Sequence, residues 1–118
     1  MVPEPSDEFK AGVVATILDS EPELALAILS KQFRVDEPTI RVGVVRKHSR
    51  DVRAIYTAKR KEILAAKREY LYDPFTVLHE FYHHLRSSGE EHRGTEKYAD
   101  KFALDFIRAY NSVVSGKR

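Results

Sequence analysis

Cysteine is absent from this 118-residue sequence, which excludes both a disulfide framework and a thiolate metal site. Long apolar runs are also missing, so no segment is predicted to span a membrane. Residues 1–6 lack the basic-then-apolar pattern of a signal peptide, and we therefore expect a cytoplasmic protein. Asparagine, glutamine and methionine occur once each while 32% of the residues are charged, a composition typical of a heat-loving source.

The charge balance does not indicate a nucleic-acid partner, because the formal net charge is only +2. Basic clusters occur at residues 46–50, 59–61 and 67–68, where predicted strands meet turns. Solvated charges at such places protect sheet edges from pairing with other chains. We therefore expect no nucleic-acid partner; contact with nucleic acid or with an acidic substrate is the alternative.

The pattern of apolar residues predicts a single α+β domain over residues 1–118. With 42% hydrophobic residues, the chain can bury one modest core. The first helix can be capped by Ser6 or Asp7. The third predicted strand, at 62–66, is equally compatible with a helix. The predicted elements are helices at 7–20 and 22–33, three short strands at 39–46, 52–58 and 62–66, and helices from 74 and at 95–112.

His79, Glu80 and His83 have the spacing H-E-x-x-H on the predicted helix that begins at Pro74 after an Asp73 cap. Positions i and i+4 lie on one helix face, so the two imidazoles can bind one metal ion. Glu80 points about 100° away around the helix. That position suits a base that holds the attacking water rather than the metal, as in zinc metalloproteases.

A helical wheel places the apolar side chains of this segment on one broad arc. The two histidines lie opposite the centre of the arc, and we expect them to face a cleft rather than the core. The arc consists of Phe75, Val77, Leu78, Phe81, Tyr82 and Leu85.

A catalytic zinc ion takes three protein ligands and leaves a fourth position open, so a third ligand must lie elsewhere in the chain. Glu96 and Asp100 occupy positions i and i+4 at the start of the predicted helix 95–112, at the margin of its apolar arc. Acidic side chains at such a margin need a partner. We expect Glu96 to be the third ligand and Asp100 to accept a hydrogen bond from a ligand histidine. The alternative is an ordinary acidic first turn favoured by the helix dipole.

The longer pattern H-E-x-x-H-x-x-G-x-x-H with a methionine turn does not fit this sequence. Arg86 stands in place of its glycine and Gly89 in place of its histidine, and the single methionine is Met1. His84 points about 100° away from the second motif histidine and cannot reach the same ion. His92 is predicted to be a solvated loop residue, with contact to a substrate or transition state as the alternative.

The motif residues of both helices resemble the gluzincin pattern. They read His79-Glu80-x-x-His83 and Glu96-x-x-Ala99-Asp100-x-x-Ala103. In gluzincins the glutamate of the second helix completes the zinc site, and the aspartate four residues on supports a ligand histidine. Among them the short chain is similar to the minigluzincins of the abylysin and jannalysin type. The similarity covers residues 73–110, and similar spacing also occurs in ImmA/IrrE-type regulator proteases.

The residues and the resemblance together predict a zinc metalloendopeptidase with a minimal gluzincin fold. We expect one catalytic Zn²⁺ held by His79, His83 and Glu96, with Glu80 as general base. A peptide or protein substrate is expected to add to an edge strand, one of the two within residues 52–66. The alternative is a zinc-containing regulatory or binding protein with narrow or negligible turnover, acting on one partner such as a repressor.

The C-terminal residues 111–118 contain a strand-forming Val113-Val114 pair. They are expected either to fray or to add to an open strand edge, lying across the zinc of their own molecule or of a neighbour. The second case implies self-association through the tail. Minigluzincins occur as latent forms in which a terminal segment obstructs the cleft, so the resemblance implies a latent, zymogen-like form with 111–118 as an inhibitory tail.

Overall fold

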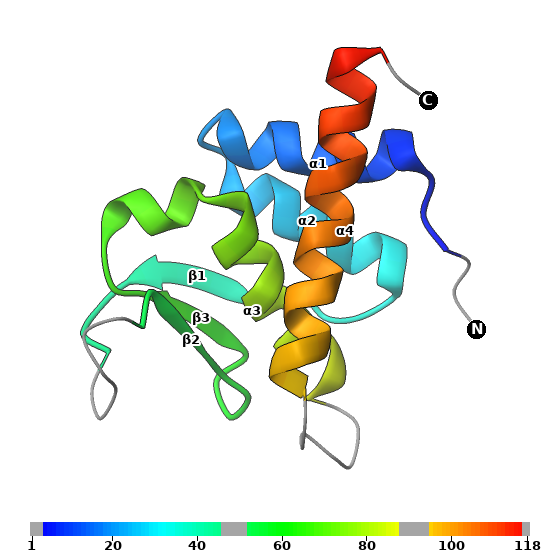
Figure 1. The fold of residues 1–118 in the computed structure, drawn as a ribbon. Helices are drawn as coiled ribbons and strands as arrows, with labels where there is room; N and C mark the ends of the chain where they lie inside the picture. The colour runs from blue at the N-terminus through cyan, green and yellow to red at the C-terminus, as the bar shows by residue number, and fades with distance from the viewer. Residues whose placement is uncertain (1–3, 46–51, 88–94, 117–118) are drawn as a thin grey trace.

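The computed structural model describes residues 4–45, 52–87 and 95–116 and has the predicted α+β fold (Figure 1). Within these ranges two helices precede a three-stranded sheet, and the helices that carry the motif residues follow it. The elements in chain order are α1 (Asp7–Leu18), α2 (Pro22–Phe33), β1 (Thr39–Val42), β2 (Ala54–Thr57), β3 (Glu62–Ala65), the short 3-10 helix η1 (Arg68–Tyr72), α3 (Pro74–Arg86) and α4 (Thr95–Ser115).

The two N-terminal helices begin and end at residues suited to those positions. The Ser6 side-chain oxygen accepts a hydrogen bond from the Phe9 N–H at 3.1 Å, which caps α1. Pro22 occupies the first turn of α2, where its missing N–H does no harm. Helix α2 ends because Arg34 adopts a left-handed backbone with φ 60°, and its N–H bonds to the Ser30 carbonyl.

Strand β3 lies at the centre of the sheet, whose order is β1-β3-β2. It pairs in parallel with β1, where Ile63 faces Ile40, and antiparallel with β2, where Ile63 faces Tyr56. Ile63 and Ala65 are buried against the helices. This burial, with a neighbouring strand on each side, decides the strand conformation of a range that is equally helix-like by sequence. Strands β1 and β2 form the two edges of the sheet.

The strands are shorter than predicted, with four residues each. β1 stops because β3 ends at Ala65, and the Gly43 N–H makes a last bond of 2.9 Å to the Ala65 carbonyl. β2 stops because Ala58 begins a tight turn, in which its carbonyl accepts a bond of 3.2 Å from the Lys61 N–H. The basic cluster 59–61 therefore lies exposed on a hairpin turn, as predicted.

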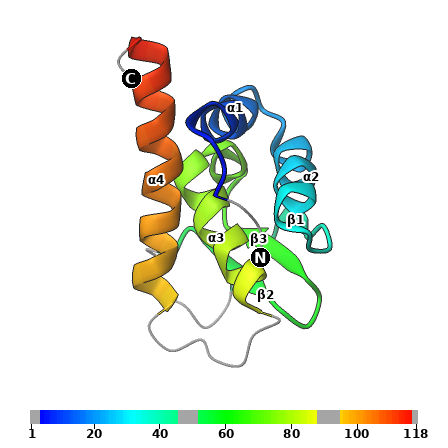
Figure 2. The same ribbon diagram turned by 90° about the vertical axis from the view of Figure 1, so that its right-hand side faces the viewer.

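Helix α3 lies in the middle of the molecule, with α4 on one side of it and α2 on the other (Figures 1 and 2). Its residues Val77, Leu78 and Phe81 are fully buried, as the apolar arc predicted. The Phe81 ring packs against Phe33 and Phe102, with centroid distances of 6.1 and 6.4 Å. Each fully buried side chain of this size contributes about 1.5–3 kcal/mol. This burial holds α3 in one orientation.

Helix α4 runs to Ser115, beyond the predicted end at 112. Of the two alternatives for this segment, an added strand at Val113 and Val114 is therefore wrong, because both residues lie on the last turns of α4. Continuing the helix satisfies backbone groups that a lone strand would leave open. A helix of 21 residues is about 30 Å long, so this end of α4 lies far from its first turn. Figure 1 shows the two ends of α4 at opposite ends of the molecule. Like the other helices that the structure describes, α4 is not apolar enough over its length to cross a membrane.

Candidate metal and catalytic site

The first turn of α3 fixes where the motif residues lie. The Asp73 carboxylate accepts a hydrogen bond from the Thr76 N–H at 3.2 Å and another from the Thr76 hydroxyl, and Pro74 follows as the first helical residue. The predicted cap and start are thus confirmed. With the apolar face turned to the core, the helix places His79 and His83 together on one side.

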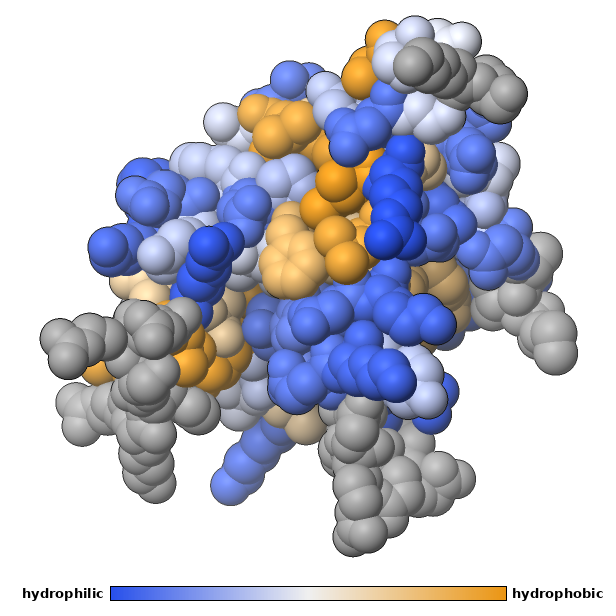
Figure 3. All heavy atoms as spheres, in the orientation of Figure 1, coloured by the Kyte–Doolittle hydropathy of each residue, from blue (hydrophilic) through white to orange (hydrophobic). Residues whose placement is uncertain are grey.

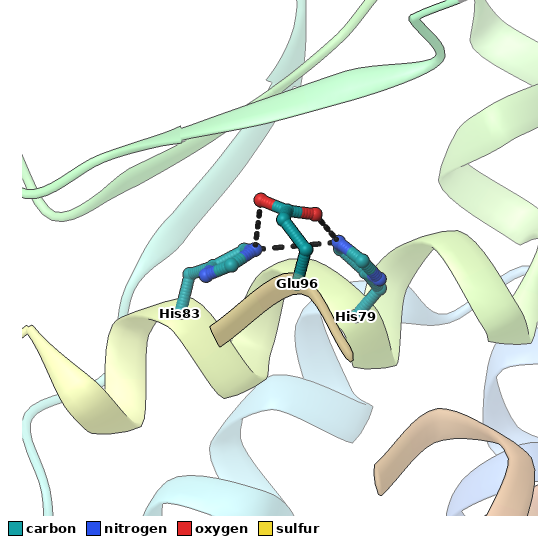
Figure 4. A group of neighbouring side chains, drawn as sticks. All are labelled: His79, His83 and Glu96. Carbon is teal, nitrogen blue, oxygen red and sulfur yellow. Dashed lines mark hydrogen bonds and ion pairs between the residues drawn. The ribbon is translucent and has the colours of Figure 1, made fainter. Parts of the chain in front are cut away.

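Three predicted ligands converge in the structure. The Nε2 atoms of His79 and His83 lie 3.3 Å apart. Glu96, in the first turn of α4, places one carboxylate oxygen 2.9 Å from Nε2 of His79 and the other 3.2 Å from Nε2 of His83 (Figure 4). One ligand atom of each residue lies within 4.8 Å of the others, so the group can hold a metal ion.

The donor set suits a small divalent cation. A tetrahedral ion with ligands at about 2.0–2.1 Å holds neighbouring ligand atoms about 3.3 Å apart, close to the separations in this group. Two imidazole nitrogens and a carboxylate that meet at one point repel each other through their lone pairs unless a proton or a cation lies between them. A metal ion would satisfy all three groups at once.

The site opens to solvent at the first turn of α4. The Glu96 side chain is 79% exposed, whereas the two histidine side chains are mostly covered. In the space-filling view, hydrophilic side chains gather over the lower part of α4, below an apolar patch beside its middle (Figure 3). The histidines are therefore held firmly while the side of Glu96 stays accessible to water and to a substrate.

Asp100 lies one helical turn after Glu96, with its Oδ1 atom 2.9 Å from Nδ1 of His79. The two atoms are not aligned as a hydrogen bond, and Nδ1 is buried with no other hydrogen-bond partner. A carboxylate at this distance favours a proton on Nδ1, which leaves the lone pair of Nε2 for a metal ion. The structure thus places Asp100 beside His79, a candidate ligand, as the sequence predicted.

Glu80 lines the same cleft as the two histidines and Glu96. Its side chain is enclosed, and the residue is only 7% exposed. Burial raises the pKa of Glu80 from 4.5 to about 8, and the charge of Glu96 adds to this effect. A carboxyl group that titrates near neutral pH can both take up and release a proton there.

The cleft has a volume of about 960 Å³, and β2 forms its other wall. The register with β3, together with a 2.8 Å bond from the Ala66 N–H to the Arg53 carbonyl, puts Arg53 and Ile55 in hydrogen-bonded pairs with β3. The backbone groups of Ala54 and Tyr56 therefore point to the open edge of the sheet. Among the described residues, an unpaired strand edge thus borders the candidate metal site.

His84 has a structural role that sequence reasoning missed, and both of its ring nitrogens are engaged away from the candidate metal ligands. It is buried, with Nε2 2.6 Å from the Asp36 carbonyl oxygen and Nδ1 2.7 Å from the Tyr56 hydroxyl. A carbonyl only accepts, so Nε2 carries the proton and Nδ1 of the neutral ring accepts from Tyr56. This pair ties β2 to α3. The one indication in the sequence is the alternation of side chains along the predicted strand 52–58, which turns Tyr56 to the face of the sheet that packs against the helices.

Three further groups were singled out in the sequence, namely His92 and two basic clusters. His92 and the basic cluster 46–50 lie outside the described residues, and the cluster 67–68 is exposed where η1 begins. Arg53, which the sequence did not single out, does line the cleft. A lone cation in a short strand gives no indication of its role before the strand is placed.

No protein-family model, curated protein or solved structure matches this chain. The fold and the site therefore define it as an α+β protein with a His-His-Glu group that can hold a metal ion. Its function is argued from the geometry of that group and of the cleft around it.

Proposed function

We propose that this chain is a zinc-dependent metallopeptidase of the minigluzincin type. The observation that carries the proposal is the convergence of His79, His83 and Glu96 in one cleft with the buried Glu80. Two imidazoles and one carboxylate are the zinc ligands of thermolysin-like peptidases. The resemblance of the motif residues to the gluzincin pattern supports the same activity.

Each residue then has a defined task. His79, His83 and Glu96 would hold the ion, and Asp100 would keep the His79 ring protonated on Nδ1. Zinc bound there would supply Lewis-acid activation of a water molecule and of the scissile carbonyl. Glu80 would take a proton from the attacking water and give it to the leaving amine. Its burial would keep that proton in the cleft between the two transfers.

The substrate would bind as an added strand on β2. The outward backbone groups of Ala54 and Tyr56 can pair with an extended peptide, which gives affinity without a particular side-chain sequence. Of the two strands within 52–66, β3 is paired on both sides and β2 is open on one. The register therefore favours β2 for this role.

The test compares the zinc-loaded full chain with Glu80→Gln on a mixture of unstructured peptides. Cleavage is followed by mass spectrometry, and bound zinc is measured by elemental analysis. The full chain should cut peptides and carry one zinc ion. The variant should keep its zinc and lose at least about a hundredfold in rate, because Gln preserves shape and removes the base.

The outcomes separate the alternatives. Loss of zinc from Glu80→Gln would make Glu80 a ligand and overturn its role as base. A zinc-loaded chain that cuts no free peptide but cleaves a single partner protein would support the regulatory alternative. A chain that binds no zinc would exclude both.

A further inference from the structure

Arg53 directly precedes β2 and lines the cleft that holds the candidate metal site. Its Nη1 atom lies 3.2 Å from the Asp73 carboxylate, and its guanidinium lies 5.6 Å from the centre of the Tyr70 ring. A guanidinium has five N–H donors, and Asp73 engages only one of its nitrogens. The group is thus held in place while retaining donors for a second carboxylate.

Asp73 neutralises Arg53 only in part, because the same carboxylate caps α3. It also accepts hydrogen bonds from the N–H and the hydroxyl of Thr76. The acids that line the cleft are Glu80 and Glu96, and the Glu96 oxygens are engaged with the ligand histidines. Among the described residues that line the cleft, Arg53 is the one Lys or Arg, so it is the group there suited to bind an anion.

The contacts of β2 show how this strand runs along α3. At its start Arg53 contacts Asp73, before the first turn of α3, and further along Tyr56 contacts His84, near the helix end. Strand and helix therefore run in the same sense. A peptide that pairs antiparallel with β2 runs the opposite way, so its C-terminal residues lie towards Arg53. The helix rises about 9 Å from Asp73 to His79. An extended peptide covers this distance with about three residues.

We propose that Arg53 selects substrates with a carboxylate within the three residues that follow the bond to be cut. The carboxylate can come from an acidic side chain or from the C-terminus of a short peptide, since both present the same paired oxygens to a guanidinium fork. This inference rests on the proposed function, because it assumes that peptides bind along β2 beside the metal site.

The turnover experiment uses the zinc-loaded full chain and a peptide whose cleavage site has been mapped. Versions with Glu or Gln at each of the three following positions are compared, and a short version is tested with a free or an amidated C-terminus. The full chain should prefer the carboxylate by about tenfold in kcat/KM. The preference should shrink as ionic strength rises, because the charges are partly exposed to solvent.

Variants assign the preference to one side chain. Arg53→Gln should lose it, and Arg53→Lys should keep part of it, because Lys retains the charge without the fork. Arg41→Gln is the matched control, since Arg41 is similarly exposed and pairs with Glu62 away from the cleft. Zinc content and circular dichroism of each variant show whether it is folded.

A second measurement keeps this inference separate from the proposed function. The Glu and Gln peptides are labelled, and their binding to zinc-loaded Glu80→Gln is followed by fluorescence anisotropy, which needs no turnover. Tighter binding of the Glu peptides that is lost on adding Arg53→Gln supports the inference whatever the rate of cleavage. Equal binding and equal kcat/KM for the two peptides, or a preference that survives Arg53→Gln, would overturn it while leaving the peptidase proposal intact.

Discussion

The Glu96 carboxylate on α4 lies 2.9 Å from Nε2 of His79 on α3, although the two residues are 17 positions apart in the sequence. This approach depends on the packing of the two helices, in which the rings of Phe81 and Phe102 stack 6.4 Å apart. The proposed third ligand is thus positioned by the core beneath it. Metal binding and folding are therefore expected to be coupled.

The first prediction concerns zinc affinity. Glu96→Ala should lower it most, because a ligand atom is removed, whereas Asp100→Ala should lower it by about tenfold, as expected for a group that only orients a ligand histidine. Chelator competition measures both. Glu23→Ala, which removes an exposed carboxylate on α2, is the control and should not change it. Unchanged affinity in Glu96→Ala would exclude the His-His-Glu site and direct attention to His92.

The second prediction concerns the pH dependence of stability in the metal-free protein. Burial raises the pKa of Glu80 to about 8, so between pH 4.5 and 8 the folded chain keeps a proton that the unfolded chain releases. The free energy of unfolding should therefore fall as pH rises through this window, by up to about 1.4 kcal/mol per pH unit from this group.

Glu80→Gln provides the comparison, because all other titratable groups are the same in both proteins. The difference in unfolding free energy between variant and parent, from urea titrations in EDTA, should grow in favour of Gln from pH 5 to pH 8. A constant difference would show that Glu80 is ionised throughout this range in the metal-free fold.

The third prediction concerns the Tyr56–His84 pair. Tyr56→Phe removes the hydroxyl that donates to Nδ1 of His84 at 2.7 Å and leaves a buried acceptor without its partner. The free energy of unfolding should fall by about 1–3 kcal/mol. Zinc affinity should stay within about twofold, because neither residue is a proposed ligand. A large loss of zinc affinity would show that this pair also positions α3, the helix that carries the two candidate histidine ligands.

The fourth prediction concerns the C-terminal residues. Because residues 111–115 form the far end of α4, a chain that ends at Tyr110 should hydrolyse peptides at the same rate per bound zinc as the full chain in dilute solution. Rates measured over a range of protein concentrations check this. If truncation raises the rate, and more so in concentrated solution, the tail of a neighbouring molecule obstructs the cleft as the resemblance implies.

Sequence alone was sufficient where the information is local. The start of α3 follows from Asp73 and Pro74, because a cap and a proline act within one helical turn. The shared face of His79 and His83 follows from their spacing, because four residues make about one turn of any α-helix. The motif residues and the α+β class were therefore predictable without any tertiary contact.

The tertiary structure decided whatever depends on partners distant in the sequence. The range 62–66 has no strong local preference, and burial of Ile63 between two strands makes it the central strand. Among the described residues, the pairing order then leaves β2 open beside the candidate metal site, and the same packing brings Tyr56 to His84 and Arg53 to Asp73. The sequence by itself determined which side chains can hold a metal ion. Only the packing of α3, α4 and the sheet decided how these side chains meet and which strand lies beside them, because those distances arise from long-range contacts that no local spacing encodes.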